Sequence, residues 1–263
     1  MRFAHVSTPP RRALQARVCA PDKNQTTLFR RMMIKSLIFD FDGLILDTEL
    51  SAYQSWQEIY QEHQCDLPLE QWARRIGGAA DLFDPCAYLE SLLQRPVERE
   101  VLRDRRRRRH LELIALHDAL PGVEAYLAGG RRLGLKLAVA SSSTKAWVTE
   151  HLSRLGLLDC FDALRCGDSV THKKPHPELY SLALQDLGVA PEQAIAFEDS
   201  PNGVLAAQRA GIFCVAVPNI ITGQLLLDHA DLRLSSLSDL PLEDLLAEVA
   251  KRKSSNLTDN AVI

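Results

Sequence analysis

The sequence predicts an α/β protein, in which a doubly wound parallel sheet of Rossmann-like topology carries a small all-α cap domain inserted after the first strand. Two observations lead to this fold class. From residue 34 onward, short apolar runs alternate with helix-like stretches, which is typical of a parallel sheet covered by helices on both faces. The stretch 51–119 interrupts this alternation, because it shows helical periodicity and turn residues but no strand-like run. We therefore expect an α/β core made of residues 34–50 and 120–250, and a helical cap made of residues 51–119.

Four apolar runs predict the strands of the core. Each run is short and continuous, and polar or turn residues flank it, as expected for strands that are buried on both faces. The four runs are residues 37–39, 137–140, 194–197 and 213–217.

Helix-like stretches lie between these strands, and two of them carry clear signals at their ends. Pro177 and Pro201 each open a stretch, at a position where the missing N–H group of proline costs nothing. Gly188 and Gly211 follow the ends of the same stretches, where glycine commonly stops a helix. The sequence thus predicts helices at residues 144–155, 177–187 and 201–210.

The expected cap contains a run of arginines at residues 105–109, which at first sight suggests a nucleic-acid-binding patch. Consecutive residues of a helix are about 100° apart around its axis, so such a run cannot form one face. We expect a solvated helix and no nucleic-acid partner, although Arg106 or Arg109 could face the cleft between cap and core. The three tryptophans are interpreted as packing residues: Trp56, Trp72 and Trp147.

The composition limits the class of protein. Of the 263 residues, 46% are hydrophobic and 25% are charged, as in ordinary globular proteins. The formal net charge of -3 gives no overall attraction to nucleic acid or to an anionic membrane. No apolar stretch approaches the roughly 20 residues that a membrane span needs, and the 6 cysteines form no CxxC pair. We expect a cytoplasmic monomer without a membrane partner.

The two ends of the chain differ from the rest. Residues 1–33 carry several arginines against a single acid, Asp22. This balance is compatible with a transit peptide, with a disordered tail, or with translation that starts at Met32 or Met33. Residues 251–263 are expected to form a frayed tail.

Two carboxylates separated by one residue, Asp40 and Asp42, follow the first predicted strand. Ligands of open α/β sheets bind at the carboxyl ends of the strands, which places both acids at a candidate site. Gly43 gives the backbone the freedom to turn at this point, so that both side chains could serve one site. One carboxylate could then attack as a nucleophile while the other carries a proton.

Two further acids, Glu198 and Asp199, follow the predicted strand at residues 194–197. They should therefore lie at the same edge of the sheet as the first pair. Mg²⁺ prefers oxygen ligands and commonly takes one or two carboxylates, so an oxygen-rich corner of this kind fits Mg²⁺. The alternative is that Glu198 and Asp199 only cap the helix at residues 201–210.

Groups that could bind phosphate follow the second predicted strand and precede a helix. Ser141, Ser142 and Ser143 open the helix at residues 144–155, and the N–H groups at a helix N-terminus bind phosphate well. Ser142 and Ser143 could also do no more than begin that helix. Lys174 lies in a loop stiffened by two prolines, where it could meet phosphate as a fixed cation.

Four motifs, in this order, resemble those of the haloacid dehalogenase superfamily, and within it the capped phosphatase and β-phosphoglucomutase-like branch. The motifs are DFDGLILDTE at residues 40–49, VASSS at 139–143, KPHPELY at 174–180 and FEDSPNG at 197–203. The resemblance extends from Ile34 to about Leu245. It implies the fold described above and a phosphatase that forms a covalent aspartyl-phosphate. Dehalogenases of the superfamily typically lack the second aspartate, so Asp42 favours phosphoryl transfer.

The resemblance also implies a role for each matching acid. Asp40 would attack phosphorus in line, and Asp42 would protonate the leaving oxygen and then activate water. Mg²⁺ would be held by the carboxylate of Asp40, the backbone carbonyl of Asp42 and Asp199, with Glu198 as a direct or water-mediated partner.

The remaining matches concern the phosphate and the substrate. Ser141 and the backbone N–H group that follows it, that of Ser142, would hold the phosphoryl oxygens, and Lys174 would neutralise charge on the nucleophile. Gly43 and Glu49 complete the expected substrate site, because Glu49 lies in the turn into the cap and could reach the substrate.

Three neighbours of Lys174 are interpreted as accessory. Lys173 occupies a position where the family usually has a glycine, and we expect it to be a surface charge. His172 and His176 flank the loop and could tune specificity, or could simply be solvated.

Several functions stay open. The first is Mg²⁺-dependent hydrolysis of a small phosphomonoester, with a phosphorylated sugar metabolite as the favoured partner, and the second is a β-phosphoglucomutase-like phosphomutase. Mutases of this branch carry a cap histidine and a cap arginine where this sequence has Ala52 and Ala80, which favours hydrolysis. A noncatalytic sugar-phosphate or nucleic-acid binding protein is an alternative of another class, against which the intact acids count.

Overall fold

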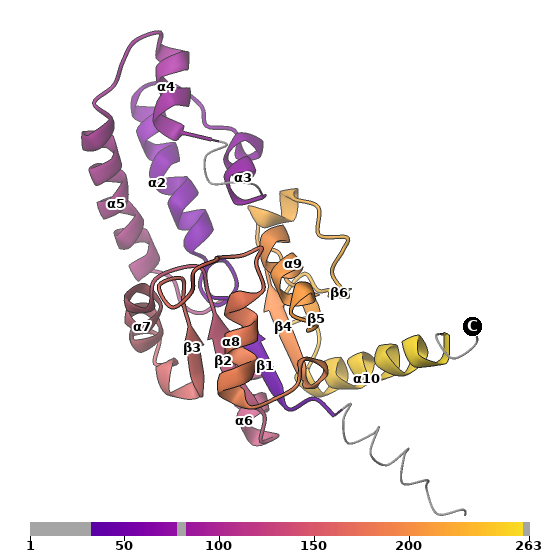
Figure 1. Cartoon of the computed structure of the whole chain (residues 1–263). Coiled ribbons are helices and arrows are strands. Elements are labelled where there is room, and N and C mark those ends of the chain that lie inside the picture. The colour runs from indigo at the N-terminus through magenta and orange to yellow at the C-terminus, as the bar shows by residue number, and fades with distance from the viewer. Residues whose placement is uncertain (1–32, 78–82, 260–263) are drawn as a thin grey trace, which may run out of the picture.

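A parallel six-stranded sheet forms the centre of the core domain (Figure 1). The computed structural model describes residues 33–77 and 83–259. The strand order is β3-β2-β1-β4-β5-β6, and every neighbouring pair is parallel. The strands are β1 Ser36–Phe39, β2 Lys136–Ala140, β3 Ala163–Arg165, β4 Ala194–Glu198, β5 Phe213–Ala216 and β6 Leu232–Arg233. The four predicted strands are present, β3 and β6 are additional, and the predicted α/β fold class is confirmed.

Helices cover both faces of the sheet, as the alternation in the sequence predicts. On one face, helices α6 (Val123–Arg132), α7 (Lys145–Arg154) and α10 (Leu242–Asp259) pack against Leu37 and Phe39 of β1 and the equivalent positions of its neighbours. On the other face, α8 (Glu178–Leu187) and α9 (Pro201–Arg209) pack against Ile38 and a set of small residues. Many of these small residues are alanines, so α8 and α9 can lie close to the strands.

The predicted helix ends lie within a residue or two of the observed ones. Thr144 caps the N-terminus of α7, because its side chain accepts a hydrogen bond from the N–H group of Trp147. Gly188 ends α8 in the left-handed conformation, with a φ of 61°. Ser200 caps α9 by accepting from Gly203, so the alternative in which Glu198 and Asp199 only cap this helix is wrong.

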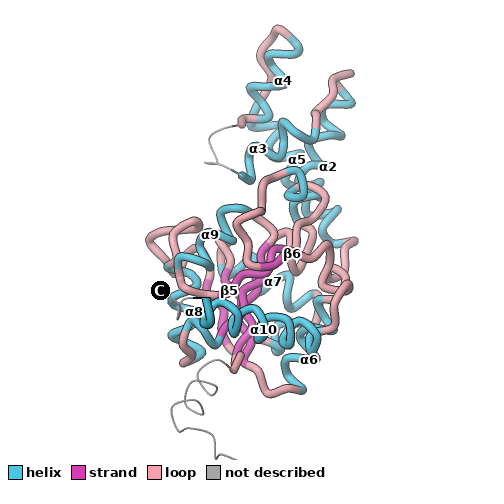
Figure 2. Tube along the Cα trace, turned by 90° about the vertical axis from the view of Figure 1, so that its right-hand side faces the viewer, coloured by secondary structure: helices cyan, strands magenta, loops and turns pink. Residues whose placement is uncertain are grey.

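The expected cap is helical, and within its described residues it contains no strand. Its helices are α2 (Thr48–Glu62), α3 (Leu69–Gly77), α4 (Pro85–Leu93) and α5 (Arg99–Ala115). They enclose a separate apolar core around Trp56, Tyr60 and Trp72. Figure 2 shows these four helices beyond one end of the strands. The chain returns to the core through Leu120, whose N–H group donates to the carbonyl of Ile45.

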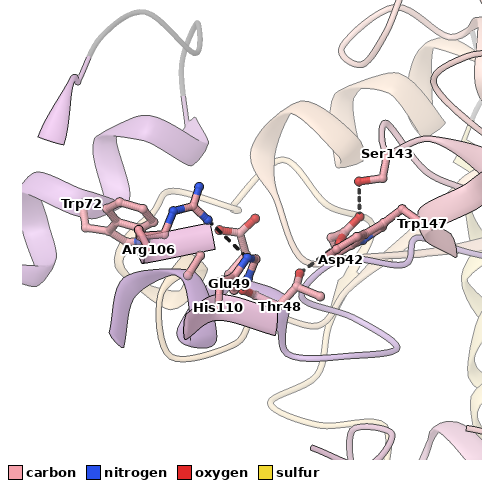
Figure 3. A pocket seen from close by; sticks show the side chains of 9 residues that line it. Asp42, Thr48, Glu49, Trp72, Arg106, His110, Ser143 and Trp147 are labelled. Carbon is pink, nitrogen blue, oxygen red and sulfur yellow. Dashed lines mark hydrogen bonds between the residues drawn. The ribbon is translucent and has the colours of Figure 1, made fainter. Parts of the chain in front are cut away.

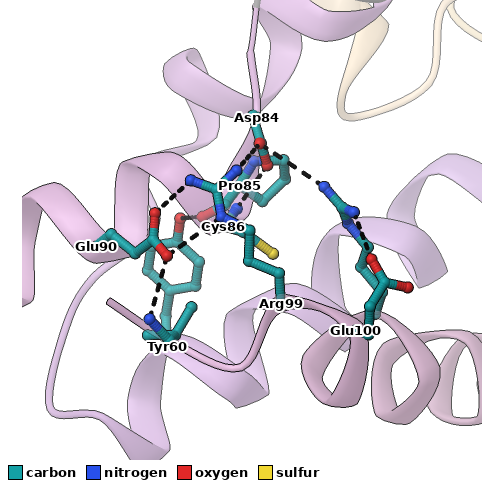
Figure 4. Close-up of polar contacts among 9 residues, drawn as sticks. Tyr60, Asp84, Pro85, Cys86, Glu90, Arg99 and Glu100 are labelled. Carbon is teal, nitrogen blue, oxygen red and sulfur yellow. Dashed lines mark hydrogen bonds and ion pairs between the residues drawn. The ribbon is translucent and has the colours of Figure 1, made fainter. Parts of the chain in front are cut away.

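Polar contacts attach α4 to its neighbours in the cap (Figure 4). The hydroxyl of Tyr60 donates to the carbonyl of Pro85 over 2.6 Å. Arg99 at the start of α5 pairs with Glu90 and, at 3.1 Å, with Asp84. These ion pairs are partly exposed, so they contribute little beyond the apolar core.

The arginine run lies on α5, and several of its members pair with acids instead of forming a basic face. Arg105 lies 2.6 Å from Glu62, and Arg109 lies 2.7 Å from Glu58 on the neighbouring helix α2. Of the two arginines considered for the cleft, Arg106 lines a pocket between cap and core.

The described part of the chain ends in α10, which continues to Asp259. The sequence predicts a frayed tail from residue 251 onward, but α10 continues beyond that point. The basic segment at residues 1–32 lies outside the described residues. Across the described ranges, no helix combines the length and the apolar character that crossing a bilayer requires.

Candidate active site

The carboxyl ends of β1 and β4 bring three acids together. Phe39 and Phe197 are partners in the parallel pair β1–β4, so Asp40 and Glu198, which follow them, lie side by side. Carboxylate oxygens of Asp40, Glu198 and Asp199 all lie within 4.8 Å of one another, and all three residues are buried. We call these three residues the acidic cluster.

Lys174 reaches the acidic cluster from the loop before α8. Its Nζ atom lies 2.5 Å from Asp40 Oδ1 and 2.5 Å from Glu198 Oε1, and its side chain is 7% exposed. The hydroxyl of Tyr180 donates to the same Glu198 oxygen over 2.6 Å. Glu198 is therefore held by a cation and a hydroxyl, while Asp40 shares the cation.

Burial and mutual repulsion govern the charge state of the acidic cluster. Burial and the neighbouring acids raise the pKa of Asp40 to about 8, although the ammonium of Lys174 opposes the shift. Burial, and then the charges of Asp40 and Glu198, raise the pKa of Asp199 well above its usual range. Burial alone would lower the pKa of Lys174, but the two carboxylates outweigh it and raise that pKa.

The acidic cluster fits a hard divalent cation. Three carboxyl groups face one ammonium, so the cluster carries excess negative charge when its members are ionised. Raised pKa values in the absence of a cation are the expected consequence. Oxygen ligands of this kind suit Mg²⁺, Mn²⁺ or Ca²⁺ better than softer metals.

Asp42 lies outside the acidic cluster, and its carboxylate accepts four hydrogen bonds. Thr48 Oγ1 and Trp147 Nε1 donate to Oδ1 over 3.0 Å and 2.9 Å. Ser143 Oγ and Ser141 Oγ donate to Oδ2 over 2.7 Å and 3.3 Å. The donors come from the first cap helix, from the loop after β2 and from α7, so Asp42 lies where the cap meets the core.

Gly43 permits a close approach behind Asp199. Its φ of +83° is a left-handed conformation, and an added Cβ would lie 2.3 Å from Asp199 Oδ2. Asn219 donates to the carbonyl of Gly43 over 3.0 Å and to Asp199 Oδ2 over 2.9 Å. Gly43 thus supports Asp199 from behind and does not line the pocket described next.

An inner pocket of about 220 Å³ is lined by the predicted site residues except Gly43 and Glu198. Segments that are more than a hundred residues apart in the sequence meet there, as the strand-end argument predicts. Its lining includes Asp40, Asp42, Glu49, Ser141, Ser142, Ser143, Lys174 and Asp199. Lys173, next to Lys174, is exposed and is absent from this lining.

The two loop histidines lie away from the inner pocket. His172 and His176 are exposed, and their rings lie 4.7 Å apart. His172 Nδ1 lies 3.1 Å from Glu178 Oε2. Donor atoms of these three residues lie within 4.8 Å of one another and so form a second group that could hold a metal, but on the surface.

An outer pocket of about 290 Å³ adjoins the inner one and shares Asp42, Glu49 and Ser143 with it (Figure 3). Its other lining residues come mostly from the cap: Thr48, Ala52, Trp72, Arg106, His110 and, from the core, Trp147. Burial lowers the pKa of His110 to about 4, while a contact of 3.0 Å with the carbonyl of Thr48 opposes the shift. Cap and core together therefore enclose a cavity next to the acids.

Sequence reasoning missed several residues of this site. Trp147 was interpreted as a packing residue, yet its indole binds Asp42, and His110 was given no role. Asn219 and Tyr180 contact the acidic cluster, and Tyr180 belongs to the KPHPELY motif, which could have drawn attention to it. Ala80, one of the two positions used to separate mutase from phosphatase, lies outside the described residues.

Comparisons with known proteins agree with this geometry. A model of the family described as haloacid dehalogenase-like hydrolase matches residues 37–217. YhcW of Bacillus subtilis (strain 168), whose name includes the word phosphatase, is 49% identical over 214 residues, which cover 81% of this chain and 97% of YhcW. The phosphorylated carbohydrates phosphatase of Thermotoga maritima is 33% identical over 183 residues, which cover 68% of this chain and 82% of that protein.

A solved structure shows the same architecture. The crystal structure of β-phosphoglucomutase from Clostridium difficile matches with a TM-score of 0.64 and 25% identity, over 85% of this chain and 100% of that one. The family match spans more than half of the chain and includes the motifs that line the inner pocket. This chain therefore belongs to the haloacid dehalogenase-like hydrolase family.

Proposed function

We propose that this protein is a Mg²⁺-dependent phosphatase that hydrolyses a small phosphomonoester, with sugar phosphates favoured, through an aspartyl-phosphate on Asp40. The observation that carries the proposal is the inner pocket, where Asp40 is paired with a buried lysine beside further acids and three serines. A nucleophilic carboxylate, a fixed cation and hydroxyl donors are the groups that phosphoryl transfer needs.

In the proposed reaction, an oxygen of Asp40 attacks phosphorus, and the bond between phosphorus and the leaving oxygen breaks. Asp42 gives its proton to that leaving oxygen, which departs as an alcohol. Asp42 then takes a proton from water, and the water oxygen attacks the phosphorus of the aspartyl-phosphate. Phosphate leaves, and the Asp40 carboxylate is restored.

Other residues hold the phosphoryl group and the metal in this proposal. Ser141 and the N–H group of Ser142 bind phosphoryl oxygens, and Lys174 offsets negative charge at the point of attack. Mg²⁺ would be held by the acidic cluster and the backbone carbonyl of Asp42, and it would supply the positive charge that lets an ionised Asp40 approach a phosphate.

The outer pocket supports a polar organic group as the remainder of the substrate. Trp72 and Trp147 offer aromatic surfaces, while Arg106, His110 and Glu49 offer polar ones. This combination suits a hydroxylated carbon chain or ring, and one of the relatives is named as a phosphatase of phosphorylated carbohydrates. We therefore place the sugar or polyol of the substrate in the outer pocket.

A phosphomutase of the β-phosphoglucomutase type is the second candidate, and the similarity to the Clostridium difficile structure favours it. A mutase has to retain its product for a second phosphoryl transfer, so it needs donors in the cap. Arg106 and His110 are cap donors in the outer pocket, but Ala52, at the position where the resemblance expects a histidine, offers none. The missing histidine supports hydrolysis over the phosphomutase reaction.

The test is a phosphate-release assay over sugar, polyol and nucleotide phosphates, with and without Mg²⁺. We expect release that depends on Mg²⁺ and that falls by roughly four orders of magnitude in Asp40→Asn, because removal of a nucleophile abolishes the covalent route. Conversion of glucose 1-phosphate to its 6-phosphate faster than phosphate release would instead establish the mutase. Full cellular function of Asp40→Asn would establish the noncatalytic alternative.

A further inference from the structure

Trp147 contacts the carboxylate that the proposed reaction uses as acid and base. Its Nε1 atom donates to Asp42 Oδ1 over 2.9 Å, and Figure 3 shows the indole beside this carboxylate at the edge of the outer pocket. Thr48 donates to the same oxygen, whereas Ser141 and Ser143 donate to Oδ2. The two oxygens of Asp42 therefore have different neighbours.

The donors differ in whether they can reverse their role. The hydroxyls of Ser141, Ser143 and Thr48 can rotate, and each can accept a hydrogen bond as well as donate one. An indole N–H group can only donate. When Oδ2 is protonated, rotation of a serine hydroxyl is enough to keep the hydrogen bond. A proton on Oδ1 that points at the indole would instead meet the hydrogen of the N–H group, and the contact would break.

One ring of the cap and one ring of the core pack against the indole. The His110 ring of helix α5 lies with its centroid 6.0 Å from that of Trp147, at an interplanar angle of 29°. The ring of His151, on the same helix as Trp147, packs edge-on at 4.2 Å. His110 also contacts the carbonyl of Thr48, where the first cap helix begins. The cap thus contributes, through His110, to the position of Trp147.

We propose that Trp147 is a positioning residue that holds Oδ1 of Asp42, so that Oδ2, the oxygen beside Ser141 and Ser143 in the inner pocket, carries the proton to the leaving group. Because the ring of His110 also packs against the indole, the position of cap helix α5 affects this arrangement. The inference rests on the proposed function, in which Asp42 protonates the leaving oxygen.

The experiment compares two leaving groups. p-Nitrophenolate departs readily without a proton, whereas the alkoxide of an alkyl phosphate needs one, so loss of a positioned acid should slow only the alkyl ester strongly. The substrates are p-nitrophenyl phosphate and the fastest alkyl phosphate of the release panel, both with Mg²⁺. The quantity measured is kcat/KM, because it reports formation of the aspartyl-phosphate.

The decisive variant carries benzothienylalanine at position 147, which keeps the two-ring shape and replaces only the N–H group with sulfur. We expect its kcat/KM for the alkyl ester to fall by roughly 10- to 100-fold, the usual effect of losing a hydrogen bond to a charged group. The value for p-nitrophenyl phosphate should change less than about 3-fold. Trp147→Phe also removes the N–H group and should show the same selectivity, which keeps the test available if the benzothienylalanine variant does not fold.

Two controls separate this inference from the proposed function. Trp56 lies in the cap core, and its Nε1 has no hydrogen-bond partner among the described residues, so Trp56→Phe removes an indole without removing such a bond. Its ratio of alkyl to aryl rates should match that of the wild type. Asp42→Asn should lose the alkyl activity selectively. If Asp42→Asn shows this selective loss of the alkyl activity and the benzothienylalanine variant does not, only the inference about Trp147 fails. If neither variant shows it, the proposed role of Asp42 is overturned as well.

Discussion

Replacing Lys174 with methionine should weaken catalysis while strengthening metal binding. The ammonium lies 2.5 Å from both Asp40 and Glu198 and is nearly inaccessible to solvent. Methionine has a similar length and no charge, so the acidic cluster loses this ion pair while the space stays largely filled. The ammonium and a divalent cation compete for the same carboxylates, and a fixed cation is also needed to offset charge during phosphoryl transfer.

The loss of stability follows from the burial of the pair. Removing one partner from a buried ion pair typically costs about 3–5 kcal/mol, and we expect the lower end because the acids can take up protons. For a protein of this size, about 3 kcal/mol lowers the unfolding midpoint by about 6–12 °C.

The pH dependence has a definite sign. The pKa of Asp40 is raised to about 8 in the folded protein. Between the usual pKa of an aspartate and this value, the folded state keeps a proton on Asp40 that the unfolded state has released. Stability of the metal-free protein therefore falls as pH rises through this range. Lys174 has a raised pKa, so its contribution is present throughout this range and is lost only at higher pH. Lys174 also stabilises the ionised form of Asp40, so its removal should cost more near about pH 8, where Asp40 begins to ionise, than near about pH 6, where Asp40 keeps its proton.

The assay combines unfolding and turnover. Midpoints are measured for the wild type and Lys174→Met at both pH values, with increasing Mg²⁺, and kcat is measured with p-nitrophenyl phosphate. We expect a larger Mg²⁺-induced rise in the variant, together with a fall in kcat of about 100-fold or more. Lys173→Met is the matched control, because the neighbouring lysine is exposed, and it should behave as the wild type. The reasoning would be refuted if the unfolding midpoint fell equally in both variants, or if kcat were unchanged in Lys174→Met.

Three further predictions concern the same cluster. Gly43→Ala would place a methyl group 2.3 Å from a carboxylate oxygen of the acidic cluster, so it should abolish the stabilisation by Mg²⁺. Its control is Gly134→Ala, which is also at positive φ but has open space around it. This control should lose only about 1–2 kcal/mol of stability and should still be stabilised by Mg²⁺. Tyr180→Phe removes a buried donor to Glu198 and should cost about 1–3 kcal/mol in chemical denaturation, and a change below about 0.5 kcal/mol would show that the contact is not formed in solution. In the wild type, Mg²⁺ should raise the unfolding midpoint more near about pH 8 than near about pH 6, because protons compete for Asp40, whose pKa is about 8, and equal shifts at the two pH values would contradict that competition.

The sequence predicted those parts of the fold that depend on local patterns. The strands it identified are buried on both faces, so they appear as continuous apolar runs. Strand β6 has two residues and β3 has three, and both are only partly buried, so neither produces such a run. Their presence follows from pairing with β5 and β2, which a single stretch of sequence cannot reveal.

The site was predictable to the same extent. Residues that directly follow a strand, such as Asp40 and Asp199, were placed correctly at one edge of the sheet, because parallel strands share that edge. The helical nature of the cap could be predicted from periodicity, but not which of its residues face the core. Choosing Arg106 over Arg109 required the positions of Glu58 and α2, against which Arg109 packs.

The contacts of Asp42 show why the remainder could not be predicted. Trp147 and Asp42 are 105 residues apart, and their contact depends on the turn after β1, the start of α7 and the position of the cap together. The direction of a side chain depends on the combined positions of several elements of this kind, whereas the end of a strand is determined by one local pattern. The identity of the groups at this site is therefore encoded locally, but the orientation of its acid is encoded by the packing of cap on core. Substitutions in α5 that shift His110 should for this reason alter the chemistry of Asp42 without touching it, and the comparison of alkyl and aryl phosphates would detect that change.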